Sequence, residues 1–214
     1  MEERVLAKTV LCYGDSNTYG AKPDGTGRFA PEVRWPGVVA RVLGDGYRVI
    51  EEGLNGRTTR WDDPIELGRN GLTTLLPIVE SHNPIDLMTI MLGTNDLKAR
   101  FRLNASDIAQ SAGELGAMAK RLAVNAESAP AVILLIAPPP TTTLTQYDLM
   151  FEGAFEKSRQ FAEYYRRAAG WYGLEFFDAG SAAVSSELDG IHFDADQHQR
   201  LGEALAAKIQ SSIG

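Results

Sequence analysis

Five short apolar runs, each closed by glycine, proline or other turn-forming residues, alternate with longer amphipathic segments along this chain. The runs are residues 8–14, 47–53, 86–93, 131–140 and, more weakly, 174–180. Runs of this length and character are typical of strands that are buried on both faces of a parallel sheet. Because such strands alternate with helix-like segments, we expect an α/β fold with right-handed crossovers and helices on both faces of the sheet.

The amphipathic segments predict the helices between these strands. Apolar residues recur at helical spacing in residues 34–44, 72–82, 105–125, 150–172 and 195–212. The chain has 214 residues, without an internal repeat, a low-complexity segment or a linker-like shift in composition. We therefore expect a single domain over residues 1–214, since single α/β domains commonly reach this size.

Composition excludes several classes of partner. The formal net charge is −7, and the 21 lysine and arginine residues are scattered, so neither nucleic acid nor an anionic membrane is an expected partner. Cys12 is the single cysteine, which excludes an internal disulfide. No cluster of histidines, cysteines and carboxylates has the spacing of metal ligands, and we expect no metal and no cofactor. The N-terminal letters MEERVLAKTVLCYG contain an apolar run too short for a signal peptide or a membrane span, so a cytoplasmic protein is expected.

Four polar clusters follow the predicted strands. They are GDSN at 14–17, GLNGRTT at 53–59, GTND at 93–96 and DGIHFD at 189–194. The carboxyl ends of parallel strands meet at one edge of the sheet, which is where ligands of open α/β sheets bind. We therefore expect the four clusters to converge on one site.

Two long segments, residues 21–35 and 141–155, follow the first and fourth predicted strands. Long loops at this edge usually shape a pocket or an interface. The large side chains that could line a pocket for an acyl or aryl group are Phe29, Trp35, Trp61 and Leu97. Ordinary packing is the alternative for each of these side chains.

The clusters contain the groups that acyl transfer through a serine requires: a nucleophile, a base, a group that orients the base, and donors to the oxyanion. Ser16 can attack, His192 can take its proton, and Asp189, three residues before His192, can orient the imidazole. Asp194 and Asp196 are rival orienting groups, although carboxylates at these positions are more typical of the start of the final helix.

Donors to the oxyanion are also available in the clusters. They are the side-chain amide of Asn95, the backbone amide of Ser16 and the amide of a glycine in the second cluster. Structural roles are the alternatives, because Ser16 could cap a helix and Asn95 could form a turn. Gly25 and Gly27 lie in PDGTG, which lacks the G-K-[ST] ending of a phosphate-binding loop and indicates a flexible segment instead.

In this order, the four clusters resemble the sequence blocks of the SGNH hydrolases, also called GDSL-type esterases. The resemblance spans nearly the whole chain. The first cluster reads GDSN where the family name has GDSL, a difference that leaves Ser16 in place. The segments YGDSNTYG, EEGLNGRTT and MLGTNDLK are most similar to those of the bacterial arylesterases and acyltransferases of that family.

This resemblance implies a flavodoxin-like three-layer α/β/α sandwich with a five-stranded parallel sheet. It implies a catalytic triad of Ser16, Asp189 and His192 and an oxyanion hole formed by Ser16, Gly56 and Asn95. Of the two glycines in the second cluster, Gly56 is chosen because it lies in NGRTT, the part of the cluster that aligns with the family. The implied activity is the hydrolysis of small aryl or alkyl esters, and some relatives pass the acyl group to alcohols or peroxide. The subgroup tends to form oligomers, so a homo-oligomer is expected.

Two other functions fit the same sequence. A carbohydrate O-deacetylase of the same family would favour a long polar cleft over a narrow apolar one. A flavodoxin-like module that binds a nucleotide or flavin without catalysis would use the same edge of the sheet. Such a module would not need Asn95, Asp189 and His192 together.

Overall fold

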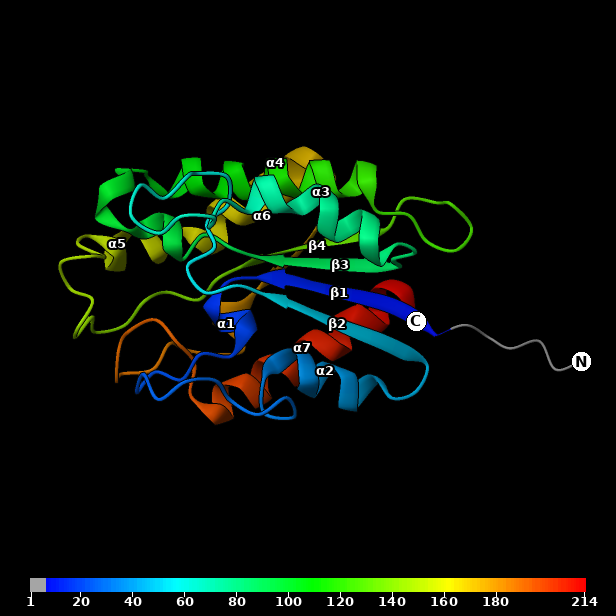
Figure 1. Cartoon of the computed structure of the whole chain (residues 1–214), viewed down its shortest axis with the longest axis horizontal. Coiled ribbons are helices and arrows are strands. Elements are labelled where there is room, and N and C mark those ends of the chain that lie inside the picture. Colours follow the sequence, from blue (N-terminus) through cyan, green and yellow to red (C-terminus); the bar gives the residue numbers. More distant parts are fainter. Residues whose placement is uncertain (1–6) are drawn as a thin grey trace, which may run out of the picture.

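Five parallel strands form one sheet between two layers of helices (Figure 1) in the computed structural model, which describes residues 7–214. The strands are β1 (Lys8–Gly14), β2 (Tyr47–Gly53), β3 (Leu87–Met91), β4 (Val132–Ala137) and β5 (Glu175–Asp178). They lie in the order β2-β1-β3-β4-β5, and every pairing is parallel. This is the flavodoxin-like order, so the predicted fold is confirmed.

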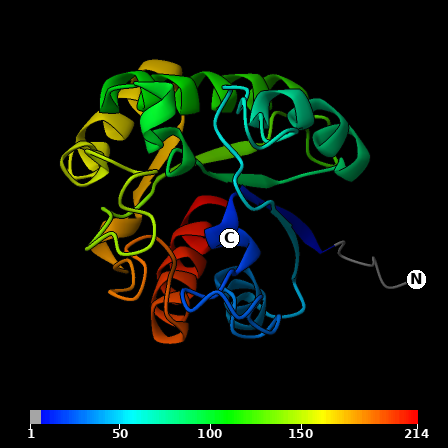
Figure 2. The same cartoon turned by 60° about the vertical axis from the view of Figure 1, so that its left-hand side comes forward.

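Seven α-helices connect and cover the strands within the described residues. They are α1 (Ser16–Tyr19), α2 (Trp35–Leu43), α3 (Gly71–His82), α4 (Ala105–Leu122), α5 (Ala154–Ser158), α6 (Phe161–Tyr172) and α7 (Ala195–Ile213). Helices α3, α4 and α6 cover one face of the sheet, and α2 and α7 cover the other (Figures 1 and 2). Short 3-10 helices span Asn95–Leu97, Ala99–Phe101 and Ala179–Ser181.

The single helix predicted for residues 150–172 is two helices, α5 and α6. Ser158 at the end of α5 is buried, and its hydroxyl accepts a hydrogen bond from the Thr141 amide at 3.0 Å. The same hydroxyl donates to the Phe155 carbonyl at 3.0 Å. These contacts bind the end of α5 to the loop after β4, and the chain turns before α6 begins.

The core lies in two apolar clusters, one on each face of the sheet. On β1, Leu11 and Tyr13 belong to the cluster under α3, α4 and α6, whereas Val10 and Cys12 belong to the cluster under α2 and α7. Alternate residues of a strand point to opposite faces. Burial on both faces explains why the strands read as continuous apolar runs instead of alternating ones.

Glycines at the ends of β1 and β2 allow the short helix α1 to approach the edge of the sheet. A Cβ at Gly14 would lie 2.0 Å from the Thr18 hydroxyl oxygen, and a Cβ at Gly53 would lie 2.1 Å from the Tyr19 nitrogen. Neither position has room for a side chain. The close approach places Ser16, the first residue of α1, directly at the carboxyl edge, where the long loops gather (Figure 2).

Residues 1–6 lie outside the described residues. They belong to the predicted domain of residues 1–214 and to the N-terminal segment in which no signal peptide is predicted. None of the helices in the described part of the chain combines the length and the apolar character that crossing a bilayer requires.

Candidate active site

The structure brings Ser16, His192 and Asp189 together in a hydrogen-bonded chain. The Ser16 Oγ lies 2.9 Å from His192 Nε2, and His192 Nδ1 lies 2.5 Å from Asp189 Oδ2. Ser16 comes from the turn after β1, while the other two residues come from the loop before α7. This is the arrangement in which an imidazole removes a proton from a serine hydroxyl while a carboxylate fixes its tautomer.

Asp189 is held as an ionised acceptor. It is 1% exposed, and its Oδ1 accepts hydrogen bonds from the amides of Ile191 and His192, both at 2.9 Å. Burial raises its pKa, but the hydrogen bond and the charge of His192, together with the two amides, outweigh burial and hold the pKa below its usual value. The carboxylate is therefore available to stabilise an imidazolium.

A second contact ties the serine turn to the histidine loop. The Asn17 side-chain amide donates to the Ile191 carbonyl at 3.1 Å. Asp15 accepts the Asn17 amide at 3.0 Å and so caps α1. These bonds fix the residues on either side of Ser16, so the orientation of the nucleophile is set by its neighbours.

The two rival carboxylates lie at the start of α7. Asp194 directly precedes the helix and makes no side-chain capping bond, and Asp196 lies in its first turn.

The three expected oxyanion donors lie around one cavity with the Ser16 hydroxyl. Ser16, Gly56 and Asn95 all line this cavity. Within residues 7–214, neither the Ser16 amide nor the Gly56 amide donates a hydrogen bond to another protein group. The Asn95 Nδ2 donates to the Arg57 carbonyl at 3.2 Å and lies 3.5 Å from Asp15 Oδ2. Two backbone amides without a protein acceptor and one side-chain amide thus line the same cavity as the Ser16 hydroxyl.

Buried polar groups hold the two loops that carry these donors. The Arg57 guanidinium donates to the Gly14 carbonyl at 2.8 Å, which binds the Gly56 loop to the end of β1. Asp96 is fully buried and accepts the Thr59 amide at 3.0 Å, which binds the same loop to the segment of Asn95. Burial raises the pKa of Asp96 to about 7, against the lowering effect of its hydrogen bonds to Thr59.

The cavity in front of Ser16 has a volume of about 320 Å³ and a mixed lining. Ala21 and Lys22 reach it from the loop after β1, and Tyr147 and Phe151 reach it from the loop after β4. Both long loops that the sequence singled out therefore contribute to the cavity wall. The Tyr147 ring packs edge-on against His192, with 6.4 Å between ring centroids.

The four large side chains expected in this pocket lie elsewhere, which corrects that prediction. Trp35 is fully buried in the core under α2 and α7, and Leu97 is buried in the core on the other face. Phe29 packs edge-on against His198, at 5.3 Å between centroids. Trp61 is 38% exposed and lines a different surface hollow. Trp35 and Leu97 lie on helical segments that bury them in the core, and Phe29 and Trp61 have contacts or exposure away from the cavity that contains Ser16.

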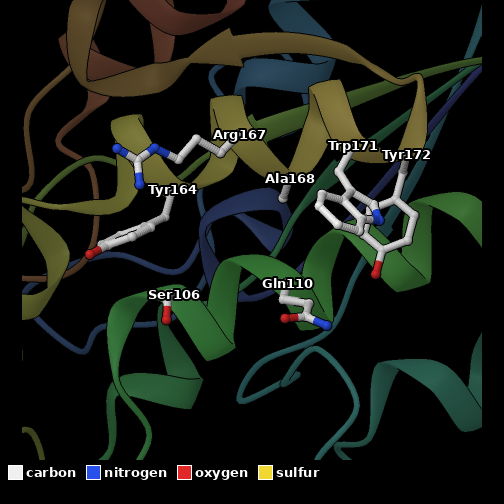
Figure 3. A pocket seen from close by; sticks show the side chains of 7 residues that line it. All are labelled: Ser106, Gln110, Tyr164, Arg167, Ala168, Trp171 and Tyr172. Atoms are coloured by element: carbon white, nitrogen blue, oxygen red, sulfur yellow. The ribbon is translucent and has the colours of Figure 1, made fainter.

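A second hollow of similar size, about 310 Å³, lies between α4 and α6 (Figure 3). It is lined by Ser106, Gln110, Tyr164, Arg167, Ala168, Trp171 and Tyr172. These seven residues include no histidine and no carboxylate that could serve as a base. Ser106 donates its hydroxyl to Asn104 at 2.7 Å, which is a helix-capping contact. Size does not distinguish the two hollows, whereas the triad does.

Sequence reasoning missed the charged residues of the cavity. Lys98 is 2% exposed at its side chain and contacts Glu66, and both line the cavity. Lys98 lies three residues after Asn95 in GTNDLK, so its place beside a site block was visible in the sequence. Its partner is 32 residues away and no local pattern pointed to it.

Comparison with known proteins identifies both the family and the fold of this chain. The model of the GDSL-like lipase/acylhydrolase family matches residues 12–200 of this chain. A comparison with curated protein sequences found no match.

Among solved structures, the native aryl esterase of M. smegmatis is 41% identical to this chain, with a TM-score of 0.90 over 96% of this chain and 99% of that one. Est24, a carbohydrate acetylesterase from Sinorhizobium meliloti, is 39% identical, with a TM-score of 0.91 over 96% of this chain and 99% of that one.

Proposed function

This chain belongs to the GDSL-like lipase/acylhydrolase family, and from that premise we propose that it is a serine esterase that hydrolyses small aryl or alkyl esters through an acyl-enzyme on Ser16. The observation that carries the proposal is the unbroken chain from the Ser16 hydroxyl through His192 to Asp189. The whole chain, residues 1–214, acts as one domain in this proposal.

Acylation begins when Ser16 Oγ attacks the ester carbonyl carbon and His192 Nε2 takes the hydroxyl proton. The new C–O bond places a negative charge on the carbonyl oxygen, which the amides of Ser16 and Gly56 and the side chain of Asn95 receive. Collapse of this intermediate breaks the bond to the alcohol, which leaves with the proton from His192. Each oxyanion donor is worth about 10²- to 10³-fold in rate.

Deacylation repeats these steps with a second nucleophile. Water attacks the acyl-enzyme, His192 takes its proton, and the carboxylic acid leaves as Ser16 regains its hydrogen. An alcohol or hydrogen peroxide in the place of water would yield a new ester or a peracid by the same balance of atoms. Acyl transfer to these acceptors is therefore part of the proposal.

Removal of acetyl groups from carbohydrates is the second candidate activity. Lys22, Asn55 and Glu66 supply polar groups to the cavity wall, and Met150 and Phe151 supply apolar ones. The similarity to the S. meliloti carbohydrate acetylesterase favours the same activity. Release of acetate from acetylated xylose, compared with release from phenyl acetate, separates the two candidates.

We also propose that the protein is a homo-oligomer. Large apolar side chains are exposed on the loop after β2 and on the loop after β4, both of which line the cavity. Ile65 is 70% exposed, Leu67 is 82% exposed and Leu149 is 83% exposed. Isolated exposed apolar residues are ordinary, but several on adjacent loops favour an interface.

The first experiment is labelling with a fluorophosphonate, followed by intact-mass measurement and peptide mapping. We expect a single adduct on Ser16, none in Ser16→Ala, and much slower labelling in His192→Ala. A control serine esterase is labelled in parallel. If the control is labelled and Ser16 is not, the site is not an activated serine and the non-catalytic binding module becomes the better explanation. A yellow purified protein would point to the same conclusion.

A further inference from the structure

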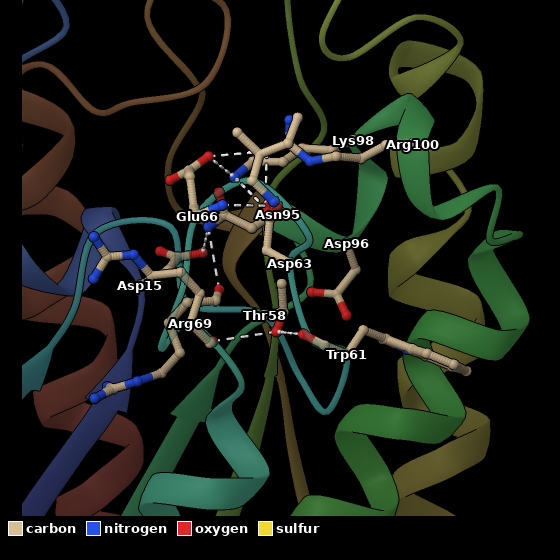
Figure 4. Close-up of polar contacts among 12 residues, drawn as sticks. Asp15, Thr58, Trp61, Asp63, Glu66, Arg69, Asn95, Asp96, Lys98 and Arg100 are labelled. Carbon is tan, nitrogen blue, oxygen red and sulfur yellow. Dashed lines mark hydrogen bonds and ion pairs between the residues drawn. The ribbon is translucent and has the colours of Figure 1, made fainter.

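Four charged residues form a compact cluster (Figure 4), and two of them, Glu66 and Lys98, line the cavity. We call Asp63, Glu66, Lys98 and Arg100 the ion-pair cluster. Lys98 Nζ lies 3.3 Å from Asp63 Oδ2 and 2.6 Å from Glu66 Oε1. Arg100 Nη2 lies 2.8 Å and 2.9 Å from the same two oxygens. Two cations and two carboxylates give the cluster a formal charge of zero.

The members of the ion-pair cluster differ in their access to the cavity. The side chain of Asp63 is fully buried, and its Oδ1 accepts the amides of Ile65 and Glu66, so it is a fixed structural anchor. The Glu66 side chain is 35% exposed, and both Glu66 and Lys98 line the cavity with Ser16. Glu66 is thus the carboxylate of the cluster that a substrate can approach.

One oxygen of Glu66 lies beside an oxyanion donor. Glu66 Oε1 contacts both cations, whereas Oε2 lies 2.7 Å from the position that a Cβ at Gly56 would occupy. A negative charge is therefore held in the wall next to Gly56 by two cations that fix its geometry. Glu66 and Ser16 line the same cavity, so an ester that reaches Ser16 binds in the space that Glu66 borders.

The charge of Glu66 also offsets one of the two lysine charges in the cavity wall. Lys22 and Lys98 both line the cavity, and among the lining residues Glu66 carries the carboxylate. Without it, the wall would be distinctly cationic and would attract negatively charged substrates. With it, Lys98 is neutralised, and a substrate carboxylate meets a fixed negative charge close to the oxyanion donors.

We propose that Glu66 is a specificity-determining residue that makes the site select uncharged esters and discriminate against esters that carry a carboxylate near the scissile bond. This inference rests on the proposed esterase activity and adds the charge class of the substrate to it. The discrimination is electrostatic, so it applies to a charge on either side of the ester bond.

Two matched substrate pairs test the inference. On the alcohol side, 2-hydroxyethyl acetate is compared with acetoxyacetate; on the acyl side, phenyl butyrate is compared with phenyl hemisuccinate. The measured quantity is the ratio of kcat/KM for the anionic member to kcat/KM for the neutral member in each enzyme. Because both values come from the same preparation, the ratio is independent of the fraction of active protein.

Glu66→Gln keeps the size of the side chain and removes its charge, which leaves the ion-pair cluster with one excess positive charge. We expect the ratio to rise about ten-fold in at least one pair, the size of effect produced by a nearby, partly exposed charge. Glu114→Gln is the matched control: Glu114 is also 35% exposed and paired with an arginine, Arg60, but it lies outside the cavity. Its ratios are expected to match the wild type.

A salt titration of the wild-type enzyme tests the same claim without a mutation. Added salt screens a partly exposed charge, so discrimination against the anionic esters should weaken as salt rises. Ratios that are the same in the wild type, Glu66→Gln and Glu114→Gln would overturn the inference. If the neutral esters are not hydrolysed at all and Ser16 is not labelled, the proposed esterase activity fails instead, so the two failures are distinguishable.

Discussion

At the scale of single residues, the two oxygens of Asp189 have separate functions. Oδ1 accepts hydrogen bonds from two backbone amides of its own loop, while Oδ2 accepts a hydrogen bond from His192 Nδ1. This division holds the carboxylate in place independently of the imidazole. The other ring nitrogen, Nε2, then faces the Ser16 hydroxyl, which is the position a general base needs.

Asp189→Asn is expected to lower kcat for phenyl acetate about 10⁴-fold, with a much smaller change in KM. The asparagine can still accept the two amides through Oδ1, but its NH₂ group faces Nδ1 and favours the tautomer that cannot accept the Ser16 proton. Steady-state kinetics measures the effect. Asp194→Asn, at the rival position before α7, is the control and should retain wild-type kcat; the opposite pattern would transfer the orienting role to Asp194.

The buried carboxyl group of Asp96 is expected to make the free energy of unfolding depend on pH. Burial raises its pKa to about 7 from a usual value of 3.8, so between about pH 4 and pH 7 the folded protein holds a proton that the unfolded chain has released. The contribution of Asp96 to the free energy of unfolding is therefore greatest below pH 4 and is lost as the pH rises through 7.

Urea unfolding between pH 5 and pH 8 checks this prediction. Asp96→Asn should show a weaker fall in stability over that range than the wild type. Asp15, whose pKa burial raises to about 6, remains in the variant and gives a residual slope. Parallel curves for the wild type and Asp96→Asn would contradict the prediction. Asp45→Asn, at an exposed position, is the control.

At the scale of elements, the packing of α2 against α7 depends on the absence of a side chain at Gly202. A Cβ at this position would lie 2.5 Å from Val38 Cβ and 2.9 Å from the Trp35 carbonyl oxygen. The contact brings α7 close to α2 on the face of the sheet opposite α3, α4 and α6 (Figure 1). Since α7 follows the loop that carries Asp189 and His192, this packing also fixes where that loop begins.

Gly202→Ala is expected to destabilise the protein, because overpacking costs about 1–3 kcal/mol and outweighs the gain of up to about 1 kcal/mol in helix propensity. Gly170 in α6 is the matched position, since no atom lies within 4 Å of its would-be Cβ. Gly170→Ala should therefore be neutral or stabilising. Thermal unfolding of both variants measures the difference, and equal shifts of Tm in the same direction would argue against close packing at Gly202.

At the scale of the whole molecule, the apolar side chains on the loops around the cavity predict assembly. Light scattering should give a mass that is a multiple of 23.3 kDa. Leu149→Asp, which places a charge on an 83% exposed apolar position, should shift the protein towards the monomer. Trp171→Asp is the control, because Trp171 is 85% exposed but lines the hollow between α4 and α6. A wild-type mass of a single chain would end the proposal.

The sequence alone determined the type of sheet, the approximate place of every strand, and the convergence of Ser16, Asp189 and His192. These features follow from local patterns together with one rule of topology. Apolar runs between turn residues specify parallel strands, and parallel strands bring their carboxyl ends to one edge. The polar residues after each strand therefore meet without any knowledge of side-chain packing.

Only the tertiary structure decided which side chains form the wall of the cavity. Trp35 follows a long loop at the site edge and Leu97 lies two residues after Asn95, yet both are in the core, while Glu66 and Lys98 line the cavity. The physical reason is that the direction of a loop side chain is set by contacts with segments far away in the chain. The pair of Lys98 with Glu66 joins residues from two loops, and no local periodicity encodes such a contact.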